Sequence, residues 1–165
     1  MEPNQIIEQI KKSLPGSIEE QIEYRNEFQV YVKKDFFTEL MQLLRKDKTL
    51  SYDLLLDVAG IDRLPDEPRF ELVYVLFSLE YNRRLIVKLK VDVSDTVPSV
   101  TGIWKSANWP EREVFDLLGI KFSGHPDLRR ILTWDNFEGH PLRKDFPLRG
   151  KDFDKKFDPD SIKVS

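Results

Sequence analysis

Residues 70–93, FELVYVLFSLEYNRRLIVKLKVDV, decide the fold of this chain. Two runs rich in leucine, β-branched and aromatic residues, 70–79 and 85–93, flank a polar turn at 80–83. This pattern is typical of a β-hairpin. Apolar residues occupy alternate positions of the second run, at Leu85, Val87, Leu89, Val91 and Val93. Because successive side chains of a strand point to opposite faces, we expect one buried face and one that meets water or a partner.

The segments before this hairpin predict a helix and another hairpin. Pro3 is tolerated in the first turn of a helix. The apolar residues that follow it have helical spacing and are Ile6, Ile7, Ile10 and Leu14. Pro15-Gly16 ends the helix. Residues 18–24 and 28–32 alternate between apolar and polar side chains, which predicts two strands joined by a turn.

A second helix and a third strand come next. Asp35 is the predicted N-cap of the helix. The side chains expected on its buried face are Phe36, Phe37, Leu40, Met41, Leu43 and Leu44. The third strand covers residues 52–60, with apolar side chains at Tyr52, Leu54, Leu56 and Val58. Residues 62–69 contain two prolines and form a loop.

The order of these elements predicts the fold class. Residues 1–107 form an α+β domain with the order α-β-β-α-β-β-β. We expect two layers, with the helices on one side of a mostly antiparallel sheet. A short helix over 108–119 and a long extended C-terminal arm over 120–165 follow.

The short helix has clear local signals. It opens at Trp109-Pro110, and Gly119 is placed to end it in a left-handed conformation. Its apolar edge consists of Val114, Leu117 and Leu118. Arg112 and Asp116 are four residues apart and are predicted to pair on the surface.

The C-terminal arm lacks helix or strand periodicity, although it is rich in aromatic residues. These are Phe122, Trp134, Phe137, Phe146, Phe153 and Phe157. Irregular segments of this length are uncommon inside compact domains unless they are functional or disordered. Disordered segments are poor in aromatic residues, so we predict that the arm docks onto a partner. A flexible terminus with scattered aromatics remains the alternative.

Composition excludes several kinds of site. The 165 residues contain no cysteine, so the chain supplies no thiolate to an iron–sulfur cluster or zinc site and forms no disulfide. No apolar run is long enough to span a membrane, and the N-terminus lacks a signal-peptide layout. We therefore expect a soluble cytoplasmic protein. Residues 1–118 carry 16 Lys and Arg against 21 Asp and Glu, whereas residues 119–165 carry 10 against 8.

Two constellations are candidates for chemical sites. Glu111 and Glu113 point about 200° apart on a helix, so they do not share a substrate atom. Glu113 and Asp116 are closer, but no nucleophile or metal ligand accompanies them. His125 and His140 each lie in a Gly-His-Pro triplet. A metal site there would need carboxylate ligands, so a turn that aims a hydrogen-bonding ring at a neighbouring surface is the simpler account.

The arm contains the residue types that are enriched at protein interfaces. These are the aromatic residues Trp134, Phe137 and Phe146 and the arginines Arg129, Arg130 and Arg143. Arg129, Arg130 and Trp134 would also suit a nucleic-acid-binding module. The acidic net charge of -3 and the lack of a nucleic-acid-binding motif oppose that alternative.

The same region resembles a known family. The sequence signature consists of Glu111-Arg112-Glu113, Asp116-Leu117-Leu118, His125, Arg129 and Ile131-Leu132. It is similar to that of the C subunit of proton-pumping NADH:quinone oxidoreductase, respiratory complex I. Residues 139–148 look like that family's tail, and residues 57–62 resemble its third strand. The resemblance covers nearly the whole chain, in the stand-alone bacterial form without a fused second domain.

The resemblance implies a non-catalytic structural subunit of the peripheral arm of that complex. Such a subunit binds no cofactor itself, since the flavin and the iron–sulfur clusters belong to partner subunits. It packs against the D subunit, which forms the quinone pocket, and lies near the B and I subunits. The complex passes electrons from NADH to quinone, coupled to proton translocation, and this subunit sits on the cytoplasmic side of the bacterial inner membrane.

The resemblance and the interface-type residues together define the predicted partner-binding residues. They are Glu111, Arg112, Glu113, Asp116, His125, Arg129, Arg130, Trp134, His140, Arg143, Asp145 and Phe146. The same role in another parent complex remains the alternative, as a subunit of a membrane-bound hydrogenase or of a ferredoxin- or F420-linked dehydrogenase. A nucleic-acid-binding module and an enzyme that uses Glu113 and Asp116 are more distant alternatives.

Overall fold

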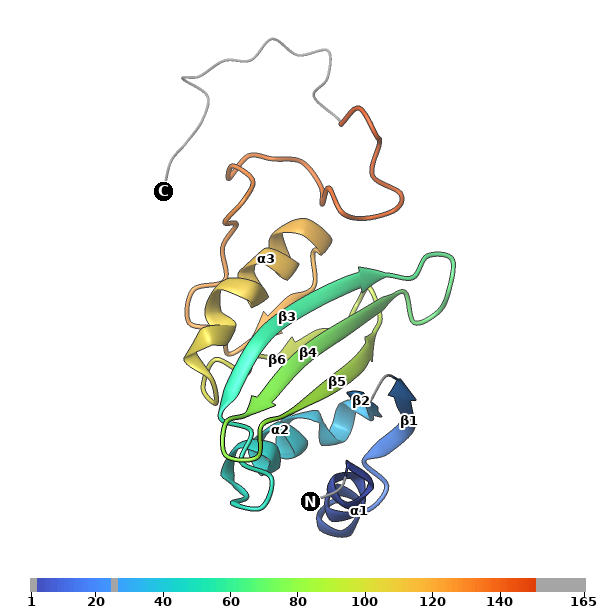
Figure 1. The fold of residues 1–165 in the computed structure, drawn as a ribbon. Helices are drawn as coiled ribbons and strands as arrows, with labels where there is room; N and C mark the ends of the chain where they lie inside the picture. The colour runs from blue at the N-terminus through green and yellow to red at the C-terminus, as the bar shows by residue number, and fades with distance from the viewer. Residues whose placement is uncertain (1–2, 25–26, 151–165) are drawn as a thin grey trace.

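The computed structural model describes residues 3–24 and 27–150, and shows three helices packed on a five-stranded sheet (Figure 1). The elements are α1 Pro3–Ser13, β1 Ile18–Tyr24, β2 Glu27–Val32, η1 Lys34–Phe36, α2 Phe37–Lys46, β3 Leu54–Asp62, β4 Phe70–Ser78, β5 Arg83–Val91, β6 Thr96–Pro98, η2 Lys105–Ala107, α3 Asn108–Leu118 and β7 Lys121–Ser123. The predicted α+β class and the α-β-β-α-β-β-β order are therefore confirmed.

The main sheet has the strand order β1-β2-β5-β4-β3. All its pairs are antiparallel except β2 with β5. The hairpin predicted from residues 70–93 forms the centre, and its register runs without a shift from Phe70↔Val91 to Ser78↔Arg83. A parallel pair needs a crossover connection, which is supplied here by α2, β3 and β4.

The core lies between one face of this sheet and the helices. It joins residues from all three helices to alternate strand residues in one cluster. The Phe37 ring of α2 lies 5.1 Å from the Tyr74 ring of β4. Val114 and Leu118 of α3 belong to the same cluster. The prediction that helices cover one side of the sheet is thereby confirmed.

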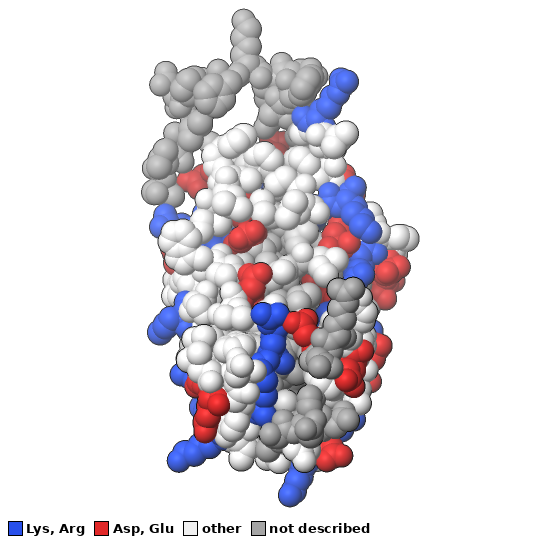
Figure 2. All heavy atoms as spheres, viewed as in Figure 1, with Lys and Arg blue, Asp and Glu red and all other residues white. Residues whose placement is uncertain are grey.

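The opposite face of the sheet bears half-buried apolar side chains, among them Val73, Val75, Phe77 and Ile86. Figure 2 shows this side of the molecule, where uncharged atoms fill much of the upper middle, and Lys and Arg lie along the lower centre, at the sides and at the lower end. The same face carries charged side chains, among them Arg84, Lys88 and Lys90 of β5, and Lys88 pairs with Glu71 of β4 at 3.0 Å.

Two local predictions about α2 and β3 are wrong. Asp35 does not cap α2, because the 3-10 turn η1 precedes the helix and Phe36 occupies the N-cap position without a side-chain cap. β3 contains a bulge between Leu55 and Asp57. A bulge inserts one residue and reverses the alternation, so Leu55 is buried whereas Leu54 and Leu56 are exposed.

The short strands β6 and β7 were not predicted. They pair in parallel from Thr96↔Lys121 to Pro98↔Ser123, with α3 as their crossover. β7 thus lies within the stretch expected to be irregular. β5 ends at Val91, so Val93 is exposed rather than buried in the strand. Within the described residues, no helix has the length and the apolar character needed to cross a membrane.

Candidate partner-binding site

Helix α3 is the base on which the described part of the C-terminal arm, residues 124–150, is held. The helix begins at Asn108, one residue before the predicted opening, and follows directly from η2. Gly119 ends it with φ 78°, the left-handed conformation that was predicted. In Figure 1 the arm, orange to red, runs past α3 after the short strand β7.

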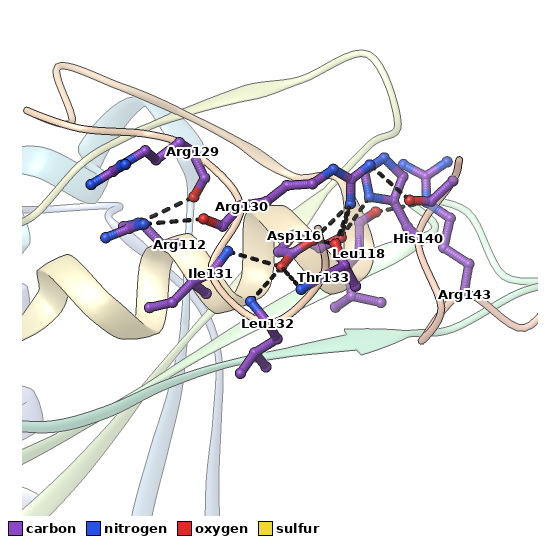
Figure 3. A network of polar contacts seen from close by, with 11 residues as sticks. Arg112, Asp116, Leu118, Arg129, Arg130, Ile131, Leu132, Thr133, His140 and Arg143 are labelled. Atoms are coloured by element: carbon purple, nitrogen blue, oxygen red, sulfur yellow. Dashed lines mark hydrogen bonds and ion pairs between the residues drawn. The ribbon is translucent and has the colours of Figure 1, made fainter. Parts of the chain in front are cut away.

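Asp116 anchors the start of the arm. Its side chain is fully buried. Its Oδ2 accepts hydrogen bonds from three successive backbone N–H groups, those of Ile131 at 3.0 Å, Leu132 at 2.8 Å and Thr133 at 2.8 Å. Its Oδ1 accepts from the Thr133 hydroxyl and from Arg130 Nη1, the latter at 2.6 Å (Figure 3). The carboxylate therefore holds the arm mainly through its backbone.

The charge of Asp116 is maintained by these contacts. Burial by itself would raise the pKa of the carboxyl. The hydrogen bonds from the Thr133 side chain and N–H, from Ile131 and from Arg130 outweigh burial and lower the pKa to about 2. Hydrogen bonds to the charged form have this effect in general. Asp116 is therefore a buried carboxylate whose hydrogen-bond donors are supplied by its own chain.

Two arginines complete this anchor. Arg112 donates to the carbonyl oxygens of Arg129 and Arg130, both at 3.1 Å. Arg130 also donates to the Gly139 carbonyl at 3.0 Å. The predicted surface pair of Arg112 with Asp116 is wrong, because both residues are buried and bind the arm instead. The irregular backbone of the arm supplies carbonyl groups, which accept hydrogen bonds from the Arg112 guanidinium. It also supplies N–H groups, which donate to the Asp116 carboxylate.

The two histidine rings are directed at α3. His125 Nε2 lies 3.1 Å from the Asn108 carbonyl, and its Nδ1 accepts from the Asp127 N–H at 3.0 Å. His140 Nδ1 lies 2.8 Å from the Asp116 carbonyl. Burial, with the positive charges of Arg143 and Arg130, lowers the pKa of His140. The neighbouring surface that the Gly-His-Pro turns were predicted to reach is thus α3 of the same chain.

Glu111 connects the start of α3 to the segment after β6. It is fully buried and accepts hydrogen bonds from the Val100 N–H at 2.8 Å and the Ser99 hydroxyl at 2.6 Å. Burial raises the pKa of Glu111 despite these bonds. His125 Nε2 lies 4.0 Å from its Oε2. No cluster of three or more metal-ligating side chains occurs within residues 3–24 and 27–150.

A second set of polar contacts holds the arm at Lys144 and Asp145. Arg69, in the loop before β4, binds Asp62 and Asp145, each at 2.7 Å. The Lys144 N–H donates to Asp62 Oδ2 at 2.8 Å. The bonds from Arg69 and the backbone N–H groups hold the pKa of Asp62 well below its usual range, although burial opposes them. Sequence reasoning did not find Arg69 or Asp62, since no spacing distinguishes them from ordinary loop residues.

The end of α3 is tied to the same part of the arm. Arg143 Nε donates to the Leu118 carbonyl at 2.6 Å, and the Leu142 N–H donates to the Leu117 carbonyl at 3.0 Å. Gly119 makes this approach possible, because a β-carbon there would lie 2.5 Å from both Arg143 Nη2 and His140 Nε2. The last carbonyl groups of the helix are thus satisfied by the arm.

The arm also carries an aromatic cluster. The Trp134 ring meets Phe137 edge-on at 4.9 Å, and Phe137 stacks on Phe146 at 5.8 Å. Trp134 is 43% exposed. Phe153 and Phe157, the last two aromatic residues of the predicted arm, lie outside the described residues. The described aromatic residues therefore gather on one surface rather than lying scattered along the arm.

The predicted partner-binding residues divide into two groups. Those whose side chains hydrogen-bond to backbone groups of α3, the arm or the segment after β6 are Glu111, Arg112, Asp116, His125, Arg130, His140 and Arg143. The remaining ones are exposed or half-buried and are Glu113, Arg129, Trp134, Asp145 and Phe146. Of these, Arg129 and Asp145 form ion pairs with Asp127 and Arg69, and the two aromatic rings contact Phe137. Contact of either group with another subunit stays a prediction.

Similarity to known proteins was found by sequence. A family model described as respiratory-chain NADH dehydrogenase, 30 Kd subunit, matches residues 30–152. The NADH-quinone oxidoreductase C subunit of Roseiflexus sp. (strain RS-1) is 42% identical over 158 residues, which cover 95% of this chain and 91% of that protein. The second NADH-quinone oxidoreductase C subunit of Rhizobium meliloti (strain 1021) is 49% identical over 119 residues, 72% of this chain and 65% of that protein. The match therefore spans just under two thirds of the Rhizobium protein.

Similarity was also found among solved structures. The trypsin-resistant fragment of Nqo5 is 32% identical, with a TM-score of 0.67, and the match covers 78% of this chain and 100% of the fragment. A chain of the membrane-bound sulfane sulfur reductase, an archaeal respiratory membrane complex, has a TM-score of 0.78 over 100% of both chains. The latter is 24% identical, so that likeness concerns the fold alone.

Proposed function

Because this chain belongs to the family of the 30 Kd subunit of respiratory-chain NADH dehydrogenase, we propose that it is a structural subunit of the peripheral arm of an NADH:quinone oxidoreductase. In this role it performs no chemistry and binds no cofactor of its own. It supports electron transfer from NADH to quinone, coupled to proton translocation, by holding neighbouring subunits in place. It lies on the cytoplasmic side of the bacterial inner membrane through its complex.

One observation carries this proposal. The charged side chains of the family signature, Arg112 and Asp116, together with Arg130, hold the backbone of residues 129–133 against α3. An irregular segment held in this way is pre-organised, which reduces the entropy lost on docking. It presents Trp134 and its aromatic neighbours to a partner, and such residues commonly dominate binding energy.

The proposed partners are the other subunits of the complex. The D subunit, which forms the quinone pocket, would pack against this chain, with the B and I subunits nearby. The flavin and the iron–sulfur clusters would be held by partner subunits.

Co-purification tests this function directly. The tagged chain is produced together with the other peripheral-arm subunits, and the subunits that elute with it are identified by mass spectrometry. We expect the D subunit to elute with the chain in stoichiometric amount. The isolated chain should show no flavin absorbance and no bound metal, and trypsin should cleave its arm until the partner is added. A tightly bound cofactor in the pure chain, or the absence of the D subunit from the eluate, would overturn the proposal.

An equivalent role in a different parent complex is the second candidate. Its support is the fold shared with the archaeal sulfane sulfur reductase complex over the whole chain. The same experiment separates the two candidates, since a hydrogenase or a ferredoxin- or F420-linked dehydrogenase would yield a different large subunit. Binding of nucleic acid is less favoured, because Arg130 is already engaged with Asp116.

A further inference from the structure

Glu113, a charged residue of the family signature, forms no contact of the kind that its neighbours on α3 make within the described residues. Glu111, Arg112 and Asp116 are buried and bind other parts of the molecule, whereas Glu113 is exposed on α3. Among residues 3–24 and 27–150, Glu113 has no ion pair or hydrogen-bonded side-chain partner. Its carboxylate is therefore available to a group outside the chain.

Asp57 of β3 is available in the same way. It is exposed at the bulge of the strand and has no ion pair within the described part of the chain. Asp57 and Glu113 line the same groove, of about 230 Å³, between β3 and α3. In Figure 2, acidic side chains stand among uncharged atoms where Figure 1 draws these two elements. Two unpaired carboxylates thus face one groove.

Apart from these two carboxylates, the groove is apolar. Its walls include Val58, Val114, Leu117, Leu118 and Leu142. Leu142 of the arm lies at the rim, where its N–H donates to the Leu117 carbonyl, and its side chain is 59% exposed. Gly60 lets α3 approach closely, since a β-carbon there would lie 2.3 Å from Leu118 Cδ1. The groove is therefore formed by the close packing of α3 on β3.

The strand beside the groove is also open to a partner. β3 is an edge strand of the sheet, and its bulge leaves Leu54 and Leu56 39% and 48% exposed. Natural proteins usually cover or charge an exposed edge of this kind. Exposed apolar surface at the edge of a subunit is typical of an interaction site.

We propose that this groove binds a short segment of a neighbouring subunit that carries Lys or Arg beside apolar side chains. The proposal rests on the proposed function, since it requires such a neighbour. An apolar segment alone would bury the two carboxylates without a counter-charge, which is costly. A Lys or Arg side chain lays its aliphatic stem along apolar surface and keeps its charge at the carboxylates.

Charge argues against an occupant from this chain. Residues 151–165 hold four Lys and four Asp, a net charge of zero, so this segment has no excess of positive charge to set against the two carboxylates. The chain as a whole is acidic, with a net charge of -3, which disfavours a second copy. Both occupants are outcomes of the experiments below.

Charge reversal tests the groove. The variant Asp57→Lys/Glu113→Lys is compared with Glu19→Lys/Glu23→Lys, which makes the same charge change at exposed positions of β1, the other edge strand. Each full-length chain is mixed with the purified peripheral-arm subunits, and the dissociation constant is measured. We expect the groove variant to bind at least about tenfold more weakly and the control to bind like the unmodified chain. Thermal melting confirms that both variants fold.

The outcomes separate this inference from the proposed function. If the unmodified chain binds no peripheral-arm subunit, the proposed function fails. If the unmodified chain binds but the groove variant binds equally well, or the control is weakened as much, the inference fails and the function stands.

Cross-linking identifies the occupant. The chain has no cysteine, so Leu142→Cys creates one thiol at the rim and leaves both carboxylates in place. A photoreactive maleimide on this thiol is activated in the assembled complex, and adducts are mapped by mass spectrometry. We expect an adduct on a peptide of a partner that contains Lys or Arg beside apolar residues. Adducts confined to residues 151–165, to a second copy, or to an acidic partner peptide would overturn the assignment.

Discussion

At the scale of single residues, Asp116 determines where the arm begins to leave the body. Three consecutive N–H groups converge on its Oδ2, an arrangement that resembles the anion-binding nests formed by irregular backbone. Here the anion is part of the protein. The N–H groups of residues 131–133 would otherwise lack partners in this irregular segment, so one buried carboxylate satisfies them all.

Replacing this carboxylate should release the arm. Asp116→Asn keeps the size of the side chain but removes the charge and places an amide beside N–H donors. We expect a loss of about 2–4 kcal/mol in the free energy of unfolding, measured by urea denaturation, and faster tryptic cleavage after Arg129 and Arg130. Glu113→Gln is the matched control, because Glu113 is exposed, and should change stability by less than about 0.5 kcal/mol. Equal stability of the two variants would contradict the anchoring role.

The pKa of Asp116 predicts how this anchor depends on pH. In the folded chain the pKa is lowered from 3.8 to about 2. A lowered pKa contributes stability that is fully present above pH 3.8 and is lost as the pH falls through 2. We expect the free energy of unfolding of the unmodified chain to fall more steeply across this window than that of Asp116→Asn. Parallel pH profiles in acid denaturation would contradict this assignment.

Residue patterns allowed some of these features to be predicted. The left-handed Gly119 and the two histidine turns follow from local chemistry, since glycine favours φ > 0 and Gly-His-Pro favours a turn. The Arg112–Asp116 pair was predicted from i,i+4 spacing and is wrong. Spacing along a helix predicts only partners on the same helix. The actual partners of Arg112 are the carbonyl groups of residues 129 and 130, which lie outside the helix.

At the scale of elements, α3 joins the body and the arm. Its inner side packs on β3 and the core, and its last carbonyl groups meet Leu142 and Arg143. The helix is also the crossover between β6 and β7. These two strands escaped prediction because three residues are too few to establish a period of two.

The end of α3 can be tested at Gly119. Gly119→Ala forces alanine into φ 78° and brings its β-carbon to 2.5 Å from Arg143 and His140. We expect a loss of about 1–3 kcal/mol in the free energy of unfolding, with faster amide exchange in residues 140–143. Gly102→Ala is the control, because nothing lies within 4 Å of the place that a β-carbon would take there. The role of Gly119 would be contradicted if both alanine variants were equally stable.

At the scale of the whole molecule, a conventional α+β body supports an arm that is held mostly by polar contacts and exposes apolar side chains. Leu132, Trp134, Leu142 and Leu148 of the arm are all exposed. A family that builds a multi-subunit complex would use such a surface for assembly. The body alone would bury enough apolar surface to fold.

Assembly should therefore be separable from folding. Trp134→Ala removes a 43% exposed ring, so the melting temperature should change little. We expect binding to the peripheral-arm subunits to weaken by about tenfold or more, measured as the yield of the co-purified D subunit. Leu79→Ala, at an exposed position in the β4–β5 turn, is the control and should assemble normally. Normal assembly of Trp134→Ala would show that the aromatic cluster is not an anchor.

The sequence by itself determined the body of this protein, the end of α3 and the family signature. Strand alternation, helical spacing and terminating glycines are local patterns that can be found from a few neighbouring residues. Only the tertiary structure decided which groups hold the arm and which remain free. The ties join residues between 14 and 82 positions apart, such as Arg130 with Asp116 and Lys144 with Asp62. An irregular segment has no period, so its partners depend on how the packed body presents its carboxylates and carbonyl groups in space.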